Sequence, residues 1–335
     1  MKNAFFSNIC TNIAPCMQTI HINMESLEGF QSPRQVAPCA ATVGFFDGVH
    51  LGHQHLIAQM REKAALLGLE TTVVTFERHP RQVLCPDWHP QLLTSLDEKV
   101  ALLAETGIDR LVVLQFDQRM AALSAHEFMR NVLLKQLGVR LLCIGYDNRF
   151  GRQRMEGFAD YVNYGHSMGM EVIQGEELRA ETLKVSSSAI RAYLAEGAVE
   201  QATQCLGHPY TLTGTVVSGC HIGTGLGFPT ANLQPDEPQK LIPANGVYAV
   251  KVQLQDVPDQ LDAMMNIGCR PTFNGHRKTL ETHILHFSSN LYGQRLAVSL
   301  IGRLRGEQKF SDERALAEQL FRDAEAATDY LNKKQ

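Results

Sequence analysis

The chain has 335 residues, enough for two domains that each bury a core of their own. Hydrophobic residues make up 44% of it and charged residues 20%, and the formal net charge of −4 lacks the basic surplus that favours a nucleic-acid partner. No run of 18 or more apolar residues occurs, which excludes a membrane-spanning helix and a membrane partner of that kind.

The N-terminus and the cysteines both favour the cytoplasm. The first 16 residues carry one lysine and no long apolar core, so we expect no signal peptide and treat Met17 as the natural start. The eight cysteines include no CxxC pair and match neither a zinc module nor a compact disulfide framework. Cys143, inside the apolar run LLCIG, is typical of a small buried hydrophobic residue. We therefore expect a reducing, cytoplasmic location.

Strand-like and helix-like segments alternate between residues 40 and 200. Apolar or β-branched runs predict buried strands over 40–45, 71–76, 111–116 and 139–145. A helix is predicted from His53 to the stop at Gly68, and two more begin at the capping-box patterns of Ser95 and Ser124. The first of these helices has one apolar side, formed by Leu56, Ile57, Met60 and Ala64. This order predicts a parallel sheet wrapped by helices, with ligands at the carboxyl ends of its strands.

The pattern changes near residue 205. Five strand-like segments punctuated by Gly, Pro and Asn follow one another, which predicts a small antiparallel barrel or sandwich. Residues 312–333 predict an amphipathic helix, whose apolar stripe contains Leu316, Leu320, Ala324 and Ala327. We therefore expect one domain over 17–187, a linker helix over 188–204 and a second domain over 205–335.

The sequence GFFDGVHLGH (44–53) follows a predicted strand and opens a helix. His50 and His53 are three residues apart and should face the same way, and free N–H groups at a helix start attract phosphate. Glycines at 44, 48 and 52 allow the backbone to approach a ligand closely. Two imidazoles and a helix terminus can stabilise charge on a phosphoryl group in transfer, so this segment predicts a nucleotidyl-transfer site.

Two other interpretations of this segment are weaker. A metal cluster of His50, His53 and His55 would have only Asp47 as a nearby acidic ligand, and it gives the glycine-rich approach no role. A plain helix cap is disfavoured because glycine in a first turn costs stability.

A second glycine-rich segment, GCHIGTGLGFPTAN (219–232), follows the first predicted strand of the C-terminal half. It has no GK[ST] and is followed by Phe-Pro rather than a helix, which excludes Walker A and dinucleotide-binding loops. Its backbone N–H groups could wrap phosphates, while Thr230 and Asn232 offer oxygen ligands to Mg²⁺. An ordinary β-turn is the alternative.

The chain resembles the bacterial bifunctional riboflavin kinase/FAD synthetases over most of its length. The HLGH motif resembles the HxGH nucleotidyltransferases, and the segments that match this family next are TFERHPR (75–81), LTSLDEKVALL (93–103), GYDNRFGRQRMEG (145–157) and VSSSAIR (185–191). The segments that resemble flavokinases are PTAN (229–232), IPANGVYAV (242–250), MNIGCRPTFNG (265–275), LETHILHF (280–287) and RLRGEQKF (303–310).

The resemblance implies a Rossmann-like nucleotidyltransferase domain, followed by an antiparallel flavokinase β-barrel with a terminal helix. It also implies two reactions: Mg-ATP phosphorylates riboflavin to FMN, and a second ATP adenylylates FMN to FAD with release of pyrophosphate. The catalytic residues that it implies are His50, His53 and the general base Glu281. The residues implied for ATP and its phosphates are Gly44, Phe45, Asp47, Gly48, Gly52, Ser186, Ser187, Ser188, Arg191, Gly223, Gly225, Gly227 and Asn232. Those implied for flavin are Phe76, His79, Asp147, Arg305 and Phe310, and those for Mg²⁺ are Thr230 and Asn232.

Three positions depart from the family pattern: Phe45 replaces an Asn, Ser188 a Thr and His286 an Asp. Some matching residues also have plain structural interpretations, as a helix cap for Ser186–Ser188, solvated charges for Arg152 and Arg154, and packing for His283. The rival functions are an enzyme that has lost one activity, a flavin-binding regulator without turnover, and a different HxGH transferase. The expected partners are riboflavin, FMN and ATP, with the oligomeric state left open.

Overall fold

The structure is a computed structural model that describes residues 17–23, 36–85, 87–178, 183–218, 227–255, 257, 259–272 and 275–334. The chain divides into two compact units. The α/β unit comprises the described residues up to 90 and those from 96 to 178, and the barrel unit comprises residues 91–95 and those from 183 onward. Each unit is described by itself.

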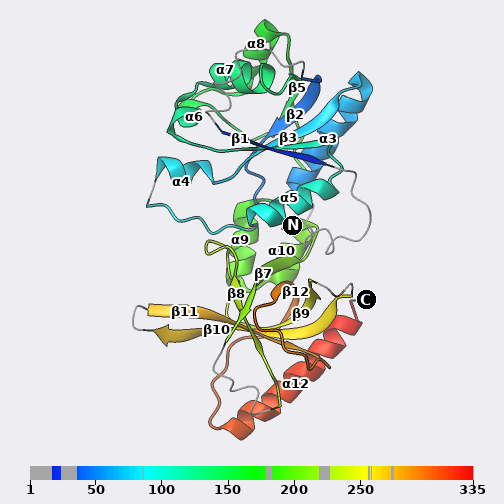
Figure 1. Ribbon diagram of the computed structural model, residues 1–335, viewed down its shortest axis with the longest axis vertical. Coiled ribbons are helices and arrows are strands. Elements are labelled where there is room, and N and C mark those ends of the chain that lie inside the picture. Colours follow the sequence, from blue (N-terminus) through cyan, green and yellow to red (C-terminus); the bar gives the residue numbers. More distant parts are fainter. Residues whose placement is uncertain are drawn as a thin grey trace. The chain divides into compact units, whose positions relative to one another are not determined.

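Figure 1 shows the sheet of the α/β unit with helices around it. The sheet has six strands in the order β1-β4-β3-β2-β5-β6, and every neighbouring pair is parallel. The strands are β1 (Gln18–Ile22), β2 (Cys39–Val43), β3 (Glu70–Phe76), β4 (Arg110–Leu114), β5 (Val139–Ile144) and β6 (Glu171–Gln174). The four strands predicted from the sequence are the four central ones, to within two residues at either end. The two edge strands, β1 and β6, were not predicted because each is short, partly exposed and without a continuous apolar run.

Helices connect the strands of this sheet. They are α3 (Leu51–Leu67), α4 (Pro80–Leu84), α5 (Leu96–Glu105), α6 (Gln118–Ala122), α7 (Ala125–Glu127), the π-helical η1 (Phe128–Leu134), the 3-10 turn η2 (Arg152–Arg154) and α8 (Phe158–Met168). Helix α3 ends at Gly68, whose φ of 63° is left-handed, and buries the four residues of its predicted apolar side. The capping box of Ser124 and Glu127 is formed. These features confirm the helix signals on which the α/β prediction depends.

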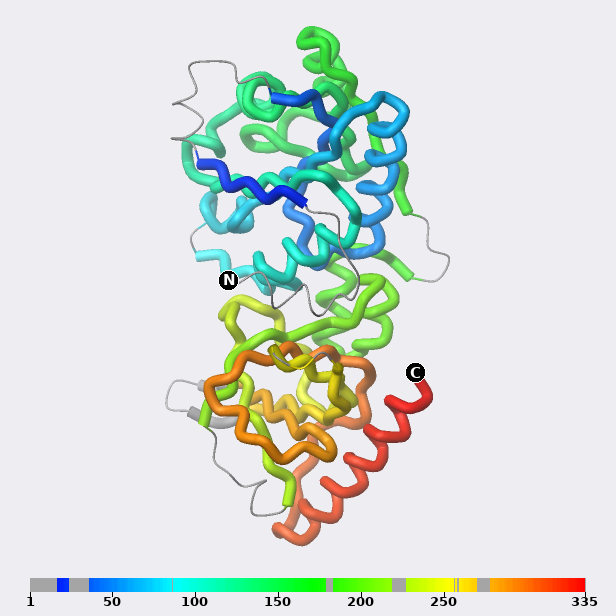
Figure 2. The backbone as a smooth tube through the Cα atoms, turned by 45° about the vertical axis from the view of Figure 1, so that its right-hand side comes forward, coloured from blue at the N-terminus to red at the C-terminus, as the bar shows by residue number. Residues whose placement is uncertain are grey.

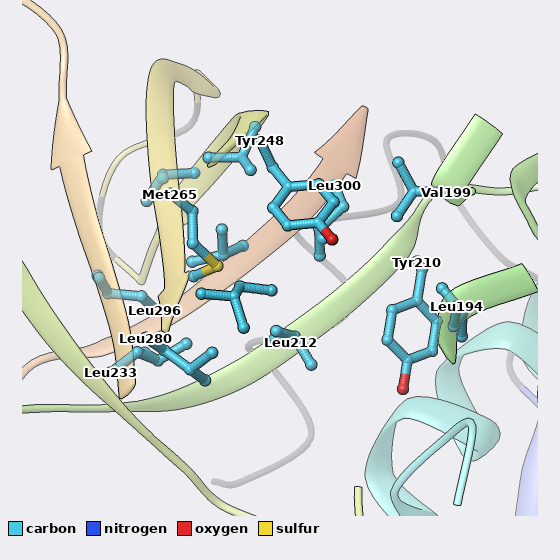
Figure 3. Close-up of a cluster of buried hydrophobic side chains, with 14 of the residues drawn as sticks. Leu194, Val199, Tyr210, Leu212, Leu233, Tyr248, Met265, Leu280, Leu296 and Leu300 are labelled. Carbon is cyan, nitrogen blue, oxygen red and sulfur yellow. The ribbon is translucent and has the colours of Figure 1, made fainter. Parts of the chain in front are cut away.

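The barrel unit contains a closed antiparallel barrel with the strand order β10-β11-β8-β7-β12-β9. Its strands are β7 (Tyr210–Val217), β8 (Ala231–Pro235), β9 (Gly246–Leu254), β10 (Leu261–Thr272), β11 (Gly275–Ile284) and β12 (Arg295–Arg305). Alternate residues such as Leu212, Met265 and Leu280 fill the interior (Figure 3). The predicted barrel is therefore confirmed.

Two helices precede the barrel where the sequence predicts one linker helix. They are α9 (Ser187–Glu196) and α10 (Val199–Leu206), separated by the left-handed Gly197 (φ 78°). Their buried residues, among them Leu194 and Val199, belong to the same hydrophobic cluster as the barrel interior (Figure 3). Leu93 belongs to it as well. The expected domain boundaries stay a prediction.

The C-terminal helix α12 (Glu313–Asn332) lies against the outside of the barrel (Figure 2). Asp312 caps its start by accepting a hydrogen bond from the amide of Ala315 at 2.8 Å. Leu320, Ala324 and Ala327 of the predicted stripe pack in one cluster with residues of β9 and β10. The predicted amphipathic helix is confirmed.

Candidate functional site

The turn between β2 and α3 has an unusual backbone. Three of its residues have left-handed φ values, Phe46 at 53°, Gly48 at 83° and Val49 at 41°, and only one of them is a glycine. Such conformations cost an L-amino acid about 1–3 kcal/mol and persist where the surroundings enforce them. The side chains of Phe46 and Val49 are almost fully buried and enforce this turn. The turn delivers His50 to the start of α3.

His50 and His53 lie together at this helix start. His50 is the N-cap rather than part of the first turn, and its Nδ1 accepts a hydrogen bond from the amide of His53 at 3.3 Å. The two imidazoles stack with their centroids 3.6 Å apart and their planes 17° apart. The rings of Phe46 and His53 also form an edge contact, with their centroids 5.1 Å apart and their planes at 73°. Both rings thus face the same way, although His50 acts as a cap.

The protonation of His53 follows from this packing. Burial, the neighbouring His50 and the ammonium of Lys99, in that order, hold the pKa of His53 well below its usual range. The ring is therefore neutral at pH 7. Its Nδ1 is buried and has no hydrogen-bond partner among the residues that the structure describes.

Three aromatic rings, those of Phe45, His79 and Trp88, contact one another in succession. The ring centroids of Phe45 and His79 are 4.7 Å apart, and those of His79 and Trp88 are 4.8 Å apart. His79 also caps α4, accepting from the amide of Arg81 at 3.1 Å. The structure thus brings Phe45 and His79 together, while Phe76 packs against Phe116. Trp88 was missed from sequence, because its contact with His79 depends on the loop after α4.

The loop after β5 carries another residue expected at the flavin. Asp147 is exposed on the turn after the strand. Its neighbour Asn148 donates a hydrogen bond to the carbonyl of Val43 at 2.6 Å and so holds this turn to the end of β2. Arg152 and Arg154 are exposed in η2, which agrees with solvated loop charges. Asn148 was missed, although it lies within the matched segment.

The serine segment lies at the start of α9, in the barrel unit. Ser186 is the N-cap and accepts from the amide of Ala189 at 3.2 Å, so the capping interpretation holds. Ser187 and Ser188 form the first turn. Arg191 donates from Nε to the carbonyl of Gln91 at 2.7 Å. Phosphate binding by these residues remains a prediction.

The barrel brings Asn232 and Glu281 together. Asn232 on β8 is the register partner of Glu281 on β11, and Glu281 is also paired with Asn266 on β10. Leu280 and Ile284 face the barrel interior, so the alternation along β11 directs Glu281 to the outer face. The Cβ atoms of cross-strand partners lie about 5 Å apart, so the side chains of Asn232, Glu281 and Asn266 are neighbours. Asn266 was missed because only the strand pairing places it beside Glu281.

Thr230 is half-buried just before β8. The preceding segment is held by His283, whose Nδ1 lies 2.8 Å from the carbonyl oxygen of Pro229 and whose ring lies 5.1 Å from Phe228. His283 therefore packs and also fixes the approach to Thr230. Gly227 is exposed with a φ of 81°. The predicted phosphate contacts at Gly223 and Gly225 fall outside the described residues.

The donor set on this face suits Mg²⁺. Thr230, Asn232 and Glu281 supply hydroxyl, amide and carboxylate oxygens, the ligands that this ion prefers. Within the described part of the chain, no group of three or more His, Cys, Asp or Glu side chains could hold a metal ion. A site for Mg²⁺ here would therefore be completed by substrate phosphates or water.

Arg305, expected at the flavin, is engaged by α12. Its Nε and Nη2 donate to the two carboxylate oxygens of Asp323 at 2.9 and 2.7 Å. Asp323 also accepts from Gln319 at 2.9 Å. The guanidinium of Arg305 lies 5.8 Å from the ring centre of Phe310. The structure thus brings Arg305 and Phe310 together beside α12.

We expect Asp323→Ala to lower the free energy of unfolding by about 3 kcal/mol. This is the lower end of the range for breaking a buried ion pair, because the side chain of Arg305 is 18% exposed and that of Asp323 only 4%. Urea denaturation followed by circular dichroism measures the change. The matched control on the same helix is Glu318→Ala, which breaks only exposed pairs with Arg314 and Arg322 and should change the value by less than about 0.5 kcal/mol. Equal effects of the two substitutions would contradict the importance of the Arg305 pair.

The departure at His286 has a backbone explanation. His286 is exposed and has a left-handed φ of 56° in the turn that follows β11. Asp and His are both enriched in this conformation relative to other residues. The turn therefore accommodates histidine where the family has aspartate.

Comparisons with known proteins match two successive stretches of the chain. A family model described as FAD synthetase matches residues 32–189, and one described as riboflavin kinase matches residues 206–331. The bifunctional riboflavin kinase/FMN adenylyltransferase of Escherichia coli (strain K12) is 37% identical over 302 residues, covering 90% of this chain and 95% of that protein. The protein of the same description from Haemophilus influenzae is 36% identical, covering 92% of this chain and 100% of the relative.

A solved structure also covers nearly the whole chain. It is the crystal structure of a Streptococcus pneumoniae protein described as a macrolide-efflux protein, with a TM-score of 0.82 and 31% identity over 92% of this chain and 99% of that one. Across the described residues of the present chain, no helix is both long and apolar enough to cross a membrane. The two family models and the full-length relatives show that the chain belongs to the bifunctional riboflavin kinase/FMN adenylyltransferase family.

Proposed function

We propose that this chain performs both reactions of its family in the cytoplasm. The barrel unit transfers the γ-phosphoryl group of ATP to riboflavin and forms FMN, and the HxGH segment transfers AMP from ATP to FMN and forms FAD and pyrophosphate. The observation that carries the proposal is the presence of both constellations in one chain, the stacked His50 and His53 after β2 and the Glu281–Asn232 pair on the barrel. The cysteines that the structure describes are all free, which supports a reducing location.

In the kinase reaction, Glu281 acts as the general base. Its carboxylate accepts the proton of the terminal ribityl hydroxyl as that oxygen attacks the γ-phosphorus, and the bond to the bridging oxygen of ADP breaks. Asn232, on the neighbouring strand, holds the phosphates and with Thr230 would ligate Mg²⁺. The ion, when bound, would neutralise phosphate charge. The pairing of β11 with β8 fixes Glu281 beside Asn232, so the base is positioned before the substrate binds.

The adenylyl transfer needs no general base. The FMN phosphate is already an anion, and its oxygen attacks the α-phosphorus of ATP while the bond to pyrophosphate breaks. The residues therefore have to hold two anions together and stabilise the charge on the departing pyrophosphate. The side chains of His50 and His53 serve this purpose, together with the positive end of the α3 dipole at which they lie.

His53 serves as a neutral hydrogen-bond donor in this proposal. Its lowered pKa removes the cation, and a proton on the buried Nδ1 would have no acceptor among the described residues. The proton therefore lies on Nε2, which donates to a phosphate oxygen.

The assignment of the proton to Nε2 predicts which amide side chain can replace His53. Glutamine places its amide nitrogen near the position of histidine Nε2, whereas asparagine places it near Nδ1. We expect the rate of FMN adenylylation to be roughly tenfold higher for His53→Gln than for His53→Asn. This factor corresponds to one hydrogen bond to a charged group, which His53→Gln keeps and His53→Asn loses. Rates of FAD formation from added FMN and ATP measure this difference. The reverse order would contradict the Nε2 assignment.

The function itself is tested by incubating the protein with riboflavin, ATP and Mg²⁺ and separating the flavins by chromatography. We expect FMN first and FAD after it. FMN alone would mean that the adenylyltransferase is inactive, and direct addition of FMN then tests that half by itself. Flavin and ATP binding without either product would instead favour the flavin-binding regulator.

A further inference from the structure

A buried lysine lies directly behind the HxGH turn. Lys99 of α5 is 2% exposed, and its ammonium donates to the carbonyl oxygens of Phe45 at 3.1 Å and Phe76 at 3.0 Å. These two residues stand at the carboxyl ends of the adjacent strands β2 and β3. The same ammonium lies 4.1 Å from the ring centre of Phe45. One side chain thus ties the end of β2, from which the HxGH turn departs, to the end of β3.

A neutral group already donates to one of these two carbonyls. The hydroxyl of Thr75 already donates to the Phe45 carbonyl at 3.1 Å. Burying an ammonium ion costs several kcal/mol, which a purely structural hydrogen bond does not require. The charge acts on the two titratable groups that face it: it is attracted by the buried carboxylate of Asp47 and lowers the pKa of His53. The ammonium of Lys99 therefore interacts electrostatically with Asp47 in the turn and with His53 of the motif.

We propose that Lys99 is a positioning residue for adenylyl transfer, whose charged ammonium fixes the ends of β2 and β3 and thereby the place of Phe45 and the HxGH turn. This inference rests on the proposed FMN adenylyltransferase activity. Phe45, where the family has Asn, fits the arrangement, because its carbonyl accepts from Lys99 while its ring receives the ammonium by a cation–π contact.

The arrangement gives FAD formation a pH dependence. Burial lowers the pKa of Lys99 to about 8, and Asp47 opposes the decrease. The charged form is therefore present below pH 8 and is lost as the pH rises through 8. We expect FMN adenylylation to decline above pH 8, with no matching decline in FMN formation at the barrel site.

The test compares Lys99→Arg and Lys99→Met in the full-length protein. Arginine stays charged to above pH 12, so Lys99→Arg should keep adenylylation within about tenfold of wild type and remove the decline above pH 8. Methionine removes both hydrogen bonds to the strand-end carbonyls and the charge. Lys99→Met should therefore lower kcat for FMN adenylylation about 100-fold, as expected when reacting groups are misplaced by about 1 Å. Riboflavin phosphorylation by the same preparations should stay unchanged and reports on the barrel unit. Thermal unfolding followed by circular dichroism checks that the α/β unit of each variant is folded.

Lys240→Met is the matched control. Lys240 is also buried, donates to the carbonyl of Leu93 at 2.8 Å and lies 4.8 Å from the ring centre of Tyr210, but it belongs to the barrel unit. Its loss should cost stability and leave the decline in adenylylation above pH 8 in place.

A decline that persists in Lys99→Arg, or full adenylylation by Lys99→Met, would overturn the inference. If Lys99→Met does not fold, the pH profile of Lys99→Arg still decides. A wild-type protein that forms no FAD at any pH would overturn the proposed function and the inference with it, whereas wild-type FAD formation that does not fall above pH 8 overturns the inference alone.

Discussion

Replacing Glu281 by glutamine is expected to stop FMN formation from riboflavin and to leave FAD formation from added FMN unchanged. Glutamine keeps the size of the side chain but cannot accept the proton of the ribityl hydroxyl. Loss of a positioned general base lowers the rate by about 10²–10⁴-fold. The register pairing of Glu281 with Asn232 and Asn266 lies within the barrel, so the HxGH segment keeps every contact described above.

The measurement is the initial rate of each reaction in the same preparation, with riboflavin or FMN as the substrate. Glu318→Gln is the matched control, because it removes one carboxylate from an exposed position on α12 and should alter neither rate. Equal loss of both activities in a folded Glu281→Gln protein would contradict the assignment of separate sites. Normal FMN formation would contradict the role of Glu281.

The second large effect is expected for His53→Ala. This change removes the half-buried imidazole that stacks on His50 with the ring centroids 3.6 Å apart, together with its donor to the phosphates. Removing one donor to a developing oxyanion costs about 10²–10³-fold in kcat. We therefore expect FAD formation from FMN to fall by that factor, with FMN formation from riboflavin unchanged.

His55→Ala provides the control on the same helix, since it also removes an imidazole from the first turns of α3. It should leave FAD formation within about threefold of wild type, in line with a side chain that has no assigned contact to the reacting phosphates. A His53→Ala enzyme that forms FAD at the wild-type rate would refute the role of His53. Equal losses in both variants would point to damage of the helix instead.

The elements that could be predicted from sequence are those whose signal is local. The central strands of the sheet carry continuous apolar runs, and α3 carries both an apolar side and a glycine stop. The edge strand β1, with the sequence QTIHI, becomes a strand only by pairing with β4, more than 80 residues later in the chain. Its formation depends on a partner that no local pattern identifies.

The candidate sites divide in the same way. The HxGH residues and Thr230, Asn232 and Glu281 lie in matched segments and were predicted from them. Lys99 and Asn266 also lie in matched segments, but their importance depends on contacts across the fold, with two strand-end carbonyls in one case and a register partner in the other. The role of His50 as a helix cap likewise depends on the left-handed turn before it.

The central claim is that one chain carries two separate active sites, and mixing the two single variants tests it most directly. Glu281→Gln supplied with riboflavin and Mg-ATP should make neither FMN nor FAD, and His53→Ala should make FMN with little FAD. In an equimolar mixture, FMN released by His53→Ala becomes the substrate of Glu281→Gln, so we predict that FAD accumulates from riboflavin. A mixture that forms no more FAD than His53→Ala alone, while Glu281→Gln also fails to adenylylate added FMN, would contradict the claim.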